Sequence, residues 1–347
     1  DSPEIIVLDK LNLLAENLDI EADEFSVDIN SLKAEEGRGL KINNLYTRFS
    51  YSPKMMELED LLLETPFSKL DADIRMDYVM DDFSDFENKV KIEADIRDSQ
   101  FATQDLQIFY KPFGDDQDLV INTNLKGTLN NFKLEDFQLE GMDRSSIDGN
   151  MLVEGVFSEE MKDFKLTGDF KDLSSNYYDL INLLPSLFRE KLPLTLRDFG
   201  NLKMQGNTIL TKSSLIADVF IVTQLGTAKA DVTMQNLNNS ADVTYKGNLI
   251  FSQFNIGRLL DDPKLGKTSF NLFIDGKGFT TEDLNTQVRG KISKLAYNDY
   301  TYSDVLIMGT VKNLIFNGNL VSNDPNLRLE FSGLVDVSAK ENNYDFE

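Results

Sequence analysis

The 347-residue chain contains no cysteine, no histidine and no tryptophan, and only eight prolines. Without cysteine it can form neither a disulfide nor a zinc–thiolate site. Without histidine it lacks the commonest general base and the Ser-His and Cys-His nucleophile pairs. The 59 acidic residues leave carboxylate catalysis open as a remote alternative, but they form no recognisable catalytic motif. We therefore expect no enzyme, no cofactor and no bound metal.

Long apolar runs and basic clusters are also missing. No apolar stretch approaches the roughly 20 residues of a membrane-spanning helix, and the mean hydropathy is −0.30. Lysine and arginine number 35 against 59 acids, for a net charge of −24. This balance argues against nucleic acid and against an anionic membrane surface, because both require clustered cations. The acids indicate a solvated outer sheet face, or a charge gradient that marks one end for a basic partner.

What the chain does have is a repeated glycine frame. Nine of its 20 glycines stand between two apolar residues, each two positions away. A two-residue period is typical of a β-strand, in which alternate side chains share a face. Glycine inside a strand marks a bend or a close approach of backbone, and on the apolar face it could also leave room for a ligand. The nine are Gly127, Gly149, Gly155, Gly168, Gly247, Gly290, Gly309, Gly318 and Gly333.

Similar alternation continues along most of the chain, interrupted by turn residues every eight to twenty positions. This spacing is too short for the crossover helices of a parallel sheet. The sequence therefore predicts an all-β fold: an elongated, twisted β-sheet curled into an open trough. The candidate residues of the apolar groove are Leu125, Ile147, Met151, Val153, Phe157, Leu166, Phe170, Tyr245, Leu249, Phe270, Leu272 and Ile274.

Two segments have helical spacing instead. Residues 174–188 begin with capping residues and place apolar side chains at helical intervals, which predicts an amphipathic helix kinked at Pro185. Residues 254–263 predict one helical turn that stops before a proline. Either segment could be a lid packed on the sheet or a mobile gate. Since no linker is visible, we expect one continuous unit over 1–347, with a helical insertion at 174–199 as its only break.

Motifs for other ligands are incomplete. Asp71-x-Asp73 and the acidic stretch at 115–118 lack the glycine and downstream glutamate of a calcium loop. Gly37-Arg38-Gly39 and Gly276-Lys277-Gly278 lack the remaining glycines of a phosphate-binding loop.

Several short segments, taken in order, resemble the TamB family of the AsmA-like superfamily, in the form typical of Bacteroidota. Each is weak alone, but their order and spacing cover most of the chain. The segments are residues 36–45, 61–70, 177–180, 255–266, 275–279, 298–302 and 323–327.

The resemblance implies a β-taco, a trough with an apolar interior, in a periplasmic protein that carries phospholipids between the inner and outer membranes. It also implies a role in outer-membrane biogenesis, an N-terminal anchor in the inner membrane, and a C-terminal domain that meets TamA, a barrel protein related to BamA. The anchor and that domain are not recognisable here, so we expect an internal fragment. The family implies no catalytic residue.

The residues favour the same function, because acyl chains need a continuous apolar surface in water, where each CH₂ is worth about 0.8 kcal/mol. An outer-membrane barrel also alternates apolar and polar residues, but it would need aromatic girdles that the sequence lacks. A structural scaffold or adhesin-like solenoid with a dry core and no lipid transport remains the main alternative.

Overall fold

The computed structural model describes residues 8–36, 39, 41–107, 117–142, 144–183, 194–239, 242–278, 283–313, 315–336 and 343–346. Contacts divide the chain into two compact units, Asp1–Leu192 and Pro193–Glu347. The division falls within the 174–199 segment that the sequence marks as a break.

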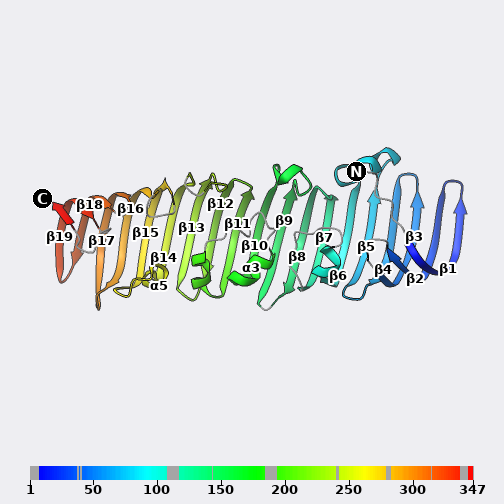
Figure 1. Ribbon diagram of the computed structural model, residues 1–347, viewed down its shortest axis with the longest axis horizontal. Coiled ribbons are helices and arrows are strands. Elements are labelled where there is room, and N and C mark those ends of the chain that lie inside the picture. The colour runs from blue at the N-terminus through cyan, green and yellow to red at the C-terminus, as the bar shows by residue number, and fades with distance from the viewer. Residues whose placement is uncertain are drawn as a thin grey trace. The chain divides into compact units, whose positions relative to one another are not determined.

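Unit 1 is an antiparallel meander in which each strand pairs with the next (Figure 1). Its strands are β1 (Leu8–Glu21), β2 (Glu24–Glu36), β3 (Lys41–Ser52), β4 (Met55–Glu64), β5 (Lys69–Asp77), β6 (Lys91–Ala102), β7 (Asp118–Thr128), β8 (Asn131–Gly141), β9 (Ser145–Glu154) and β10 (Lys165–Ser175).

Unit 2 repeats this arrangement (Figure 1). Its strands are β11 (Leu202–Thr211), β12 (Ser214–Val222), β13 (Thr227–Gln235), β14 (Thr244–Asn255), β15 (Leu265–Lys277), β16 (Asn285–Tyr297), β17 (Tyr300–Lys312), β18 (Ile315–Asp324), β19 (Leu327–Asp336) and β20 (Asn343–Phe346). The all-β, open and curled sheet predicted from the sequence is confirmed.

Each unit has an apolar face and a polar face. Residues directly opposite each other on paired strands project to the same side of a sheet. In unit 1, Leu125 lies opposite both Ala94 and Leu134, and Leu134 lies opposite Met151. In unit 2, Ala230 lies opposite Leu249, and Leu249 lies opposite Leu272. The apolar side chains of successive strands therefore lie on the same side of the sheet.

A β-bulge interrupts several strands. The extra residue of β4, β6, β8 and β14 has a left-handed backbone, at Asp60, Asp98, Asp136 and Gln253. Its N–H donates to a side chain of the following strand, for example to Asp73 Oδ1 at 2.7 Å from Asp60. The other acceptors are Asn122, Asn150 and Ser269, at 2.7–3.0 Å. Since bulges bend a strand and increase its twist, these positions account for the curl.

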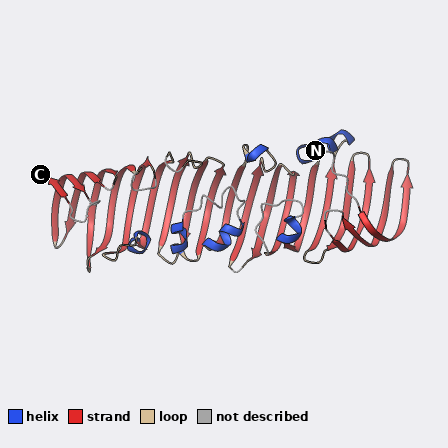
Figure 2. Cartoon of the chain, viewed as in Figure 1, coloured by secondary structure: helices blue, strands red, loops and turns tan. Residues whose placement is uncertain are grey.

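The strands also form a repeat of four strands followed by a short helix. Helix α2 (Thr103–Gln107) follows β6, α3 (Tyr177–Leu183) follows β10, and α5 (Ile256–Leu260) follows β14. The helices are visible in Figure 2. The repeat is marked by matching polar contacts: the hydroxyls of Thr47 and Thr123 each donate to the carbonyl that precedes a bulge residue, Asp60 or Asp136.

In unit 1, a buried carboxylate fixes each of the helices α2 and α3. Asp105 Oδ2 on α2 accepts hydrogen bonds from the hydroxyls of Thr65 and Ser68, at 2.5 and 2.6 Å. Asp179 Oδ2 on α3 accepts from the Ser145 hydroxyl at 2.8 Å and the Arg144 N–H at 3.1 Å. Both carboxylates are satisfied and belong to the scaffold, because buried polar groups need such partners.

The predicted helices are confirmed over the residues that the structure describes. Helix α3 is capped by Asn176, whose Oδ1 accepts from the N–H of Asp179 at 3.0 Å. Pro185, the predicted kink, lies outside the described residues. The predicted turn at 254–263 is α5, capped by Asn255.

The remaining short helices were missed from the sequence: η1 (Met80–Asp85), α1 (Phe86–Lys89), α2 and η2 (Glu159–Met161). The segment η3 (Leu194–Phe199) lies within the predicted insertion.

At most of the strand glycines, the space that a side chain would take is filled by backbone of the adjacent strand and is not open to a ligand. At Gly247, φ is +156° and a Cβ would lie 2.0 Å from the carbonyl oxygen of Asp231 on the adjacent strand. A Cβ at Gly290 would lie 2.2 Å from the carbonyl oxygen of Asn271. The expectation that these glycines leave room for lipid is therefore wrong, whereas the close backbone approach is confirmed.

Substituting Gly247→Ala should destabilise unit 2 by about 1–3 kcal/mol, because the added methyl overlaps the backbone of β13. The measurement is denaturant unfolding, with the exposed neighbour Asn248→Ala as the control, which should stay within about 0.5 kcal/mol of the native chain. Equal stability of the two variants would contradict the close approach.

The bulge contact gives a second prediction. Asn150→Ala should cost about 1 kcal/mol, because the N–H of Asp136 loses its acceptor. Asn150→Asp should be nearly silent, since a carboxylate serves the equivalent role at Asp73. Unfolding of the two variants side by side tests this, and a larger loss in the Asp variant would refute it.

Candidate functional site

The clearest candidate site is an open hollow on the apolar face of unit 2. It measures about 450 Å³, and residues of β13, β14, β15, β16 and β17 line it together with a turn residue. The lining residues are Val232, Met234, Tyr245, Leu249, Ile274, Leu284, Thr286, Val288 and Val311. Three of them, Tyr245, Leu249 and Ile274, were predicted from the sequence.

The two polar side chains in this lining are already satisfied. Tyr245 OH donates to the carbonyl oxygen of Gly278 at 3.2 Å and shares a hydrogen bond with the Thr286 hydroxyl. The Tyr245 side chain is buried. Because these polar atoms bind each other and the backbone, the hollow offers mainly C–H surface to an occupant, which fits an apolar ligand without charge.

The other two predicted residues of unit 2 lie beside the hollow on the same face. Phe270 is opposite Phe251, and their rings stack with centroids 4.5 Å apart. Leu272 lies opposite Leu249. Phe254, which is 1% exposed, also contacts Phe251: their ring centroids lie 4.5 Å apart and the rings are tilted by 38°.

The predicted residues of unit 1 mostly share its apolar face. Val153 lies opposite Leu166, and Gly149 opposite Phe170. Ile147 and Met151 pack against a buried cluster of Leu119, Phe137 and Leu139. Leu125 is half-buried on β7.

Phe157 differs from the other predicted residues. It follows β9, which ends at Glu154, and lies in a turn, 49% exposed. The apolar-x-Gly-x-apolar frame around Gly155 therefore extends past the end of the strand. The frame does not distinguish a strand from the turn that comes after it.

Sequence reasoning missed six residues of the hollow, among them the polar Thr286 on β16. Val288 and Val311 belong to glycine frames already visible in the sequence, around Gly290 and Gly309, so the signal was present. Val232 and Met234 lie on a strand without glycine, and only their alternation could have revealed them. Leu284 lies in a turn, which no periodicity marks.

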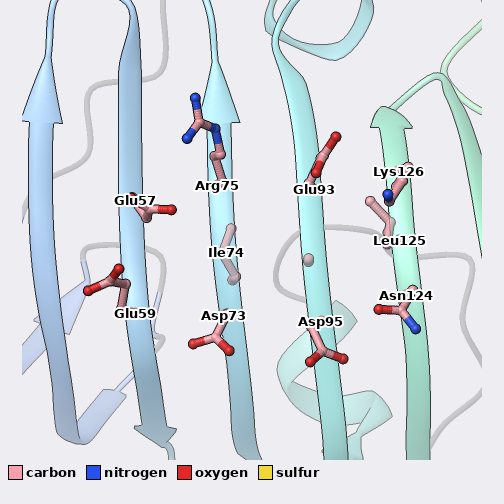
Figure 3. Close-up of a pocket in the computed structure, with 11 residues that line it drawn as sticks. Glu57, Glu59, Asp73, Ile74, Arg75, Glu93, Asp95, Asn124, Leu125 and Lys126 are labelled. Carbon is pink, nitrogen blue, oxygen red and sulfur yellow. The ribbon is translucent and has the colours of Figure 1, made fainter.

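The polar face of unit 1 carries rows of opposite charges instead (Figure 3). Arg75 lies between Glu57 and Glu93 on the neighbouring strands. Its surroundings form a shallow hollow of about 300 Å³.

Arg97 binds three carboxylates of this face. Its guanidinium lies 2.9 Å from Asp71, 2.5 Å from Asp73 and 3.3 Å from Asp95. The hydrogen bond from Arg97, followed by that from the Asp60 N–H, lowers the pKa of the Asp73 carboxyl. Within the described ranges, no group of three or more acidic side chains could hold a metal ion. On this face the carboxylates outnumber the cations that pair with them.

A separate polar cluster surrounds Asp324 at the end of β18, where its side chain is 1% exposed. It accepts from Tyr300 OH at 2.7 Å, from the Asn326 N–H at 2.9 Å, and from the N–H and hydroxyl of Ser303 at 2.8 and 2.9 Å. Burial alone would raise the pKa of Asp324, but these hydrogen bonds outweigh it and lower the pKa to about 2. All its donors are internal, so the cluster fixes the turn and offers no open site.

Comparison with known proteins finds no match: no family model, no curated protein and no solved structure corresponds to the chain. In the part of the chain that the structure describes, no helix is both long enough and apolar enough to cross a bilayer.

The Asp324 cluster predicts a pH-dependent contribution to stability. Its folded pKa of about 2 lies below the unfolded value of about 3.9, so its stabilisation is complete above about pH 4 and is lost as the pH falls toward 2. The difference in unfolding free energy between the native chain and Asp324→Asn should therefore shrink over this window. The exposed Asp231→Asn serves as the control, and a difference that does not change between pH 4 and pH 2 would exclude the assignment.

Proposed function

We propose that the chain is a segment of a periplasmic bridge-like lipid-transfer protein. In this proposal its apolar face shields phospholipid acyl chains as they pass between the inner and outer membranes, and so supports outer-membrane biogenesis. The membrane anchor and the contact with a TamA- or BamA-like barrel would belong to other parts of the protein. No catalytic step is involved.

The observation that carries the proposal is the open apolar hollow of unit 2. Its side chains, among them Leu249, Ile274 and Val288, remain half-exposed, while the charged side chains of the same strands lie on the opposite face. Leaving apolar surface in water costs about 25 cal/mol per Å², so an apolar occupant would stabilise this face. An acyl chain has the required chemistry, because it needs no polar partner.

The strand architecture suits such an occupant for a second reason. Backbone N–H and C=O groups inside the sheet are bound to neighbouring strands, so the floor of the groove presents few unsatisfied polar groups to a lipid tail. The headgroup could stay in water beyond the rim.

The main alternative is a scaffold with a dry core. The tightly packed cluster of Leu119, Phe137 and Leu139 in unit 1, each 6% exposed, favours it locally. The two functions differ in whether lipid is bound, which can be measured directly.

A photo-crosslinking amino acid at position 249 should capture phospholipid in cells, whereas one at position 250 should not. Leu249 and Ile250 are adjacent aliphatic residues of β14, but Leu249 faces the hollow and Ile250 lies on the polar face, 38% exposed. Mass spectrometry of the adducts identifies the lipid. Equal capture at both positions, or none at 249, would favour the dry scaffold.

The matched charge substitutions test occupancy without a crosslinker. Leu249→Glu should reduce the phospholipid that copurifies with the chain several-fold, because a tail must then lie against an ion that resists desolvation. Ile250→Glu should leave the amount unchanged. Circular dichroism of both variants establishes that the sheet is intact.

A further inference from the structure

Between β5 and β6 the chain leaves the sheet and forms two short helical segments, η1 and α1. Figure 1 shows this part of unit 1 in cyan at the ends of the two strands. We call residues 79–89 the rim insertion. It lies outside the strand ladder, and none of its residues lines the hollow of unit 2.

The rim insertion exposes a group of large apolar side chains. Val79 is 53% exposed, Met80 59% and Phe83 39%. Side chains three positions apart lie above one another in a 3₁₀ helix, so Met80 and Phe83 share one side of η1. Adjacent exposed apolar side chains on a soluble surface are typical of contact sites for other molecules.

Internal contacts hold these side chains in place. The Phe83 ring packs edge-on against the ring of Tyr78, which is buried, with centroids 4.6 Å apart. Tyr78 OH donates to the carbonyl oxygen of Ser52 at 3.0 Å. The Val79 N–H donates to Asp82 Oδ2 at 2.8 Å and so caps η1. Because the insertion is ordered by its own contacts, binding to a partner would cost little further ordering.

Carboxylates border the exposed apolar group. The rim insertion contains four of them, on Asp81, Asp82, Asp85 and Glu87, against the single cation of Lys89. Within the described residues, no ion pair joins any of the four to a cation. The insertion is therefore an apolar stripe with acidic flanks.

Two lysines flank the insertion and do not reverse its charge. Lys91 lies opposite Asp77 on the neighbouring strand. Lys54 lies in the turn before β4, where its carbonyl oxygen accepts from the Tyr78 N–H at 2.9 Å. With these two lysines and Asp77 included, the carboxylates are still in excess.

We infer that the rim insertion docks into an apolar groove, bordered by lysine and arginine, on a partner protein. A short amphipathic helix inserts its apolar side chains into such a groove, with anchors at the spacing of Val79, Met80 and Phe83. The acidic flanks match a cationic border.

Two other occupants fit this surface less well. Helices that lie on membranes are rich in lysine and arginine on their polar face, whereas acidic flanks are repelled by an anionic leaflet. A second copy of the chain offers the apolar hollow of unit 2, but no cation lines that hollow. The net charge of −24 also opposes association of two copies.

The test uses a designed helical hairpin labelled with fluorescein, in which two helices form a leucine-lined groove bordered by lysines. Its matched control has glutamate in place of every bordering lysine. Anisotropy with the whole chain should show binding of the lysine hairpin, weakening as salt rises from about 0.05 to about 0.5 M, and much weaker binding of the glutamate hairpin.

Matched variants locate the binding, because an acidic chain attracts a basic probe over its whole surface. Met80→Ser should raise the Kd about fivefold or more, whereas Met308→Ser on unit 2, where the side chain is also 59% exposed, should leave it unchanged. Circular dichroism of both variants establishes that the sheet is intact.

A second pair of variants tests the charges. Asp81→Asn/Glu87→Gln should raise the Kd and make it less dependent on salt. Asp218→Asn/Asp231→Asn removes two exposed carboxylates from unit 2 and should have a much smaller effect.

Three results would overturn the inference: no binding of the lysine hairpin, equal binding of both hairpins, or equal losses in the two members of either variant pair. Flotation with vesicles containing anionic phospholipid is the remaining arm. Binding to vesicles that Met80→Ser abolishes, without binding to the hairpin, would assign the insertion to a membrane instead. None of these outcomes depends on whether the apolar face of unit 2 holds lipid.

Discussion

The constraint on which the structure depends is the two-residue period of paired strands. A shift of one residue in register would move the apolar side chains of a whole strand to the polar face. Each bulge adds one residue to its strand. The two faces nevertheless stay separate, because the added residue adopts the left-handed backbone conformation and the alternation resumes after it. Leu58 and Leu61 both face the apolar side although three positions separate them, since Asp60 occupies the bulge between them.

This constraint explains why polar contacts cluster at the bulges. The residue in the bulge loses its ladder partner, and an unpaired N–H costs free energy. The side chains of Asp73, Asn122, Asn150 and Ser269 supply the missing acceptor from the following strand. Strand curvature therefore depends on a few polar side chains, and the apolar face it shapes carries the candidate groove.

Features that depend on periodicity could be predicted from the sequence, whereas features that depend on individual contacts could not. Alternation was sufficient for the all-β fold and for the faces of Leu125, Met151 and Leu249. It could not limit β9 to Glu154, so Phe157 was assigned to a strand. The four-strand repeat could not be predicted either, because the repeats share no sequence motif. They are related by hydrogen bonds from residues such as Thr47 and Thr123. The strand glycines are a further example. The sequence predicts that they lie on the apolar face, but only the structure shows that a Cβ there would approach a carbonyl oxygen of the adjacent strand too closely.

The two units keep the same kind of apolar face but carry different polar faces, and the difference reflects the separate demands on each face. The apolar face has to remain apolar on every strand, which limits its residues to a narrow set. The polar face needs only to be soluble, so its side chains can vary without loss of the fold. Arg75 lies between two glutamates, while Lys229 lies between a phenylalanine and an isoleucine. The exposed Phe220 and Met308 of unit 2 show how far this face can vary while the two-residue period, and with it the fold, is kept.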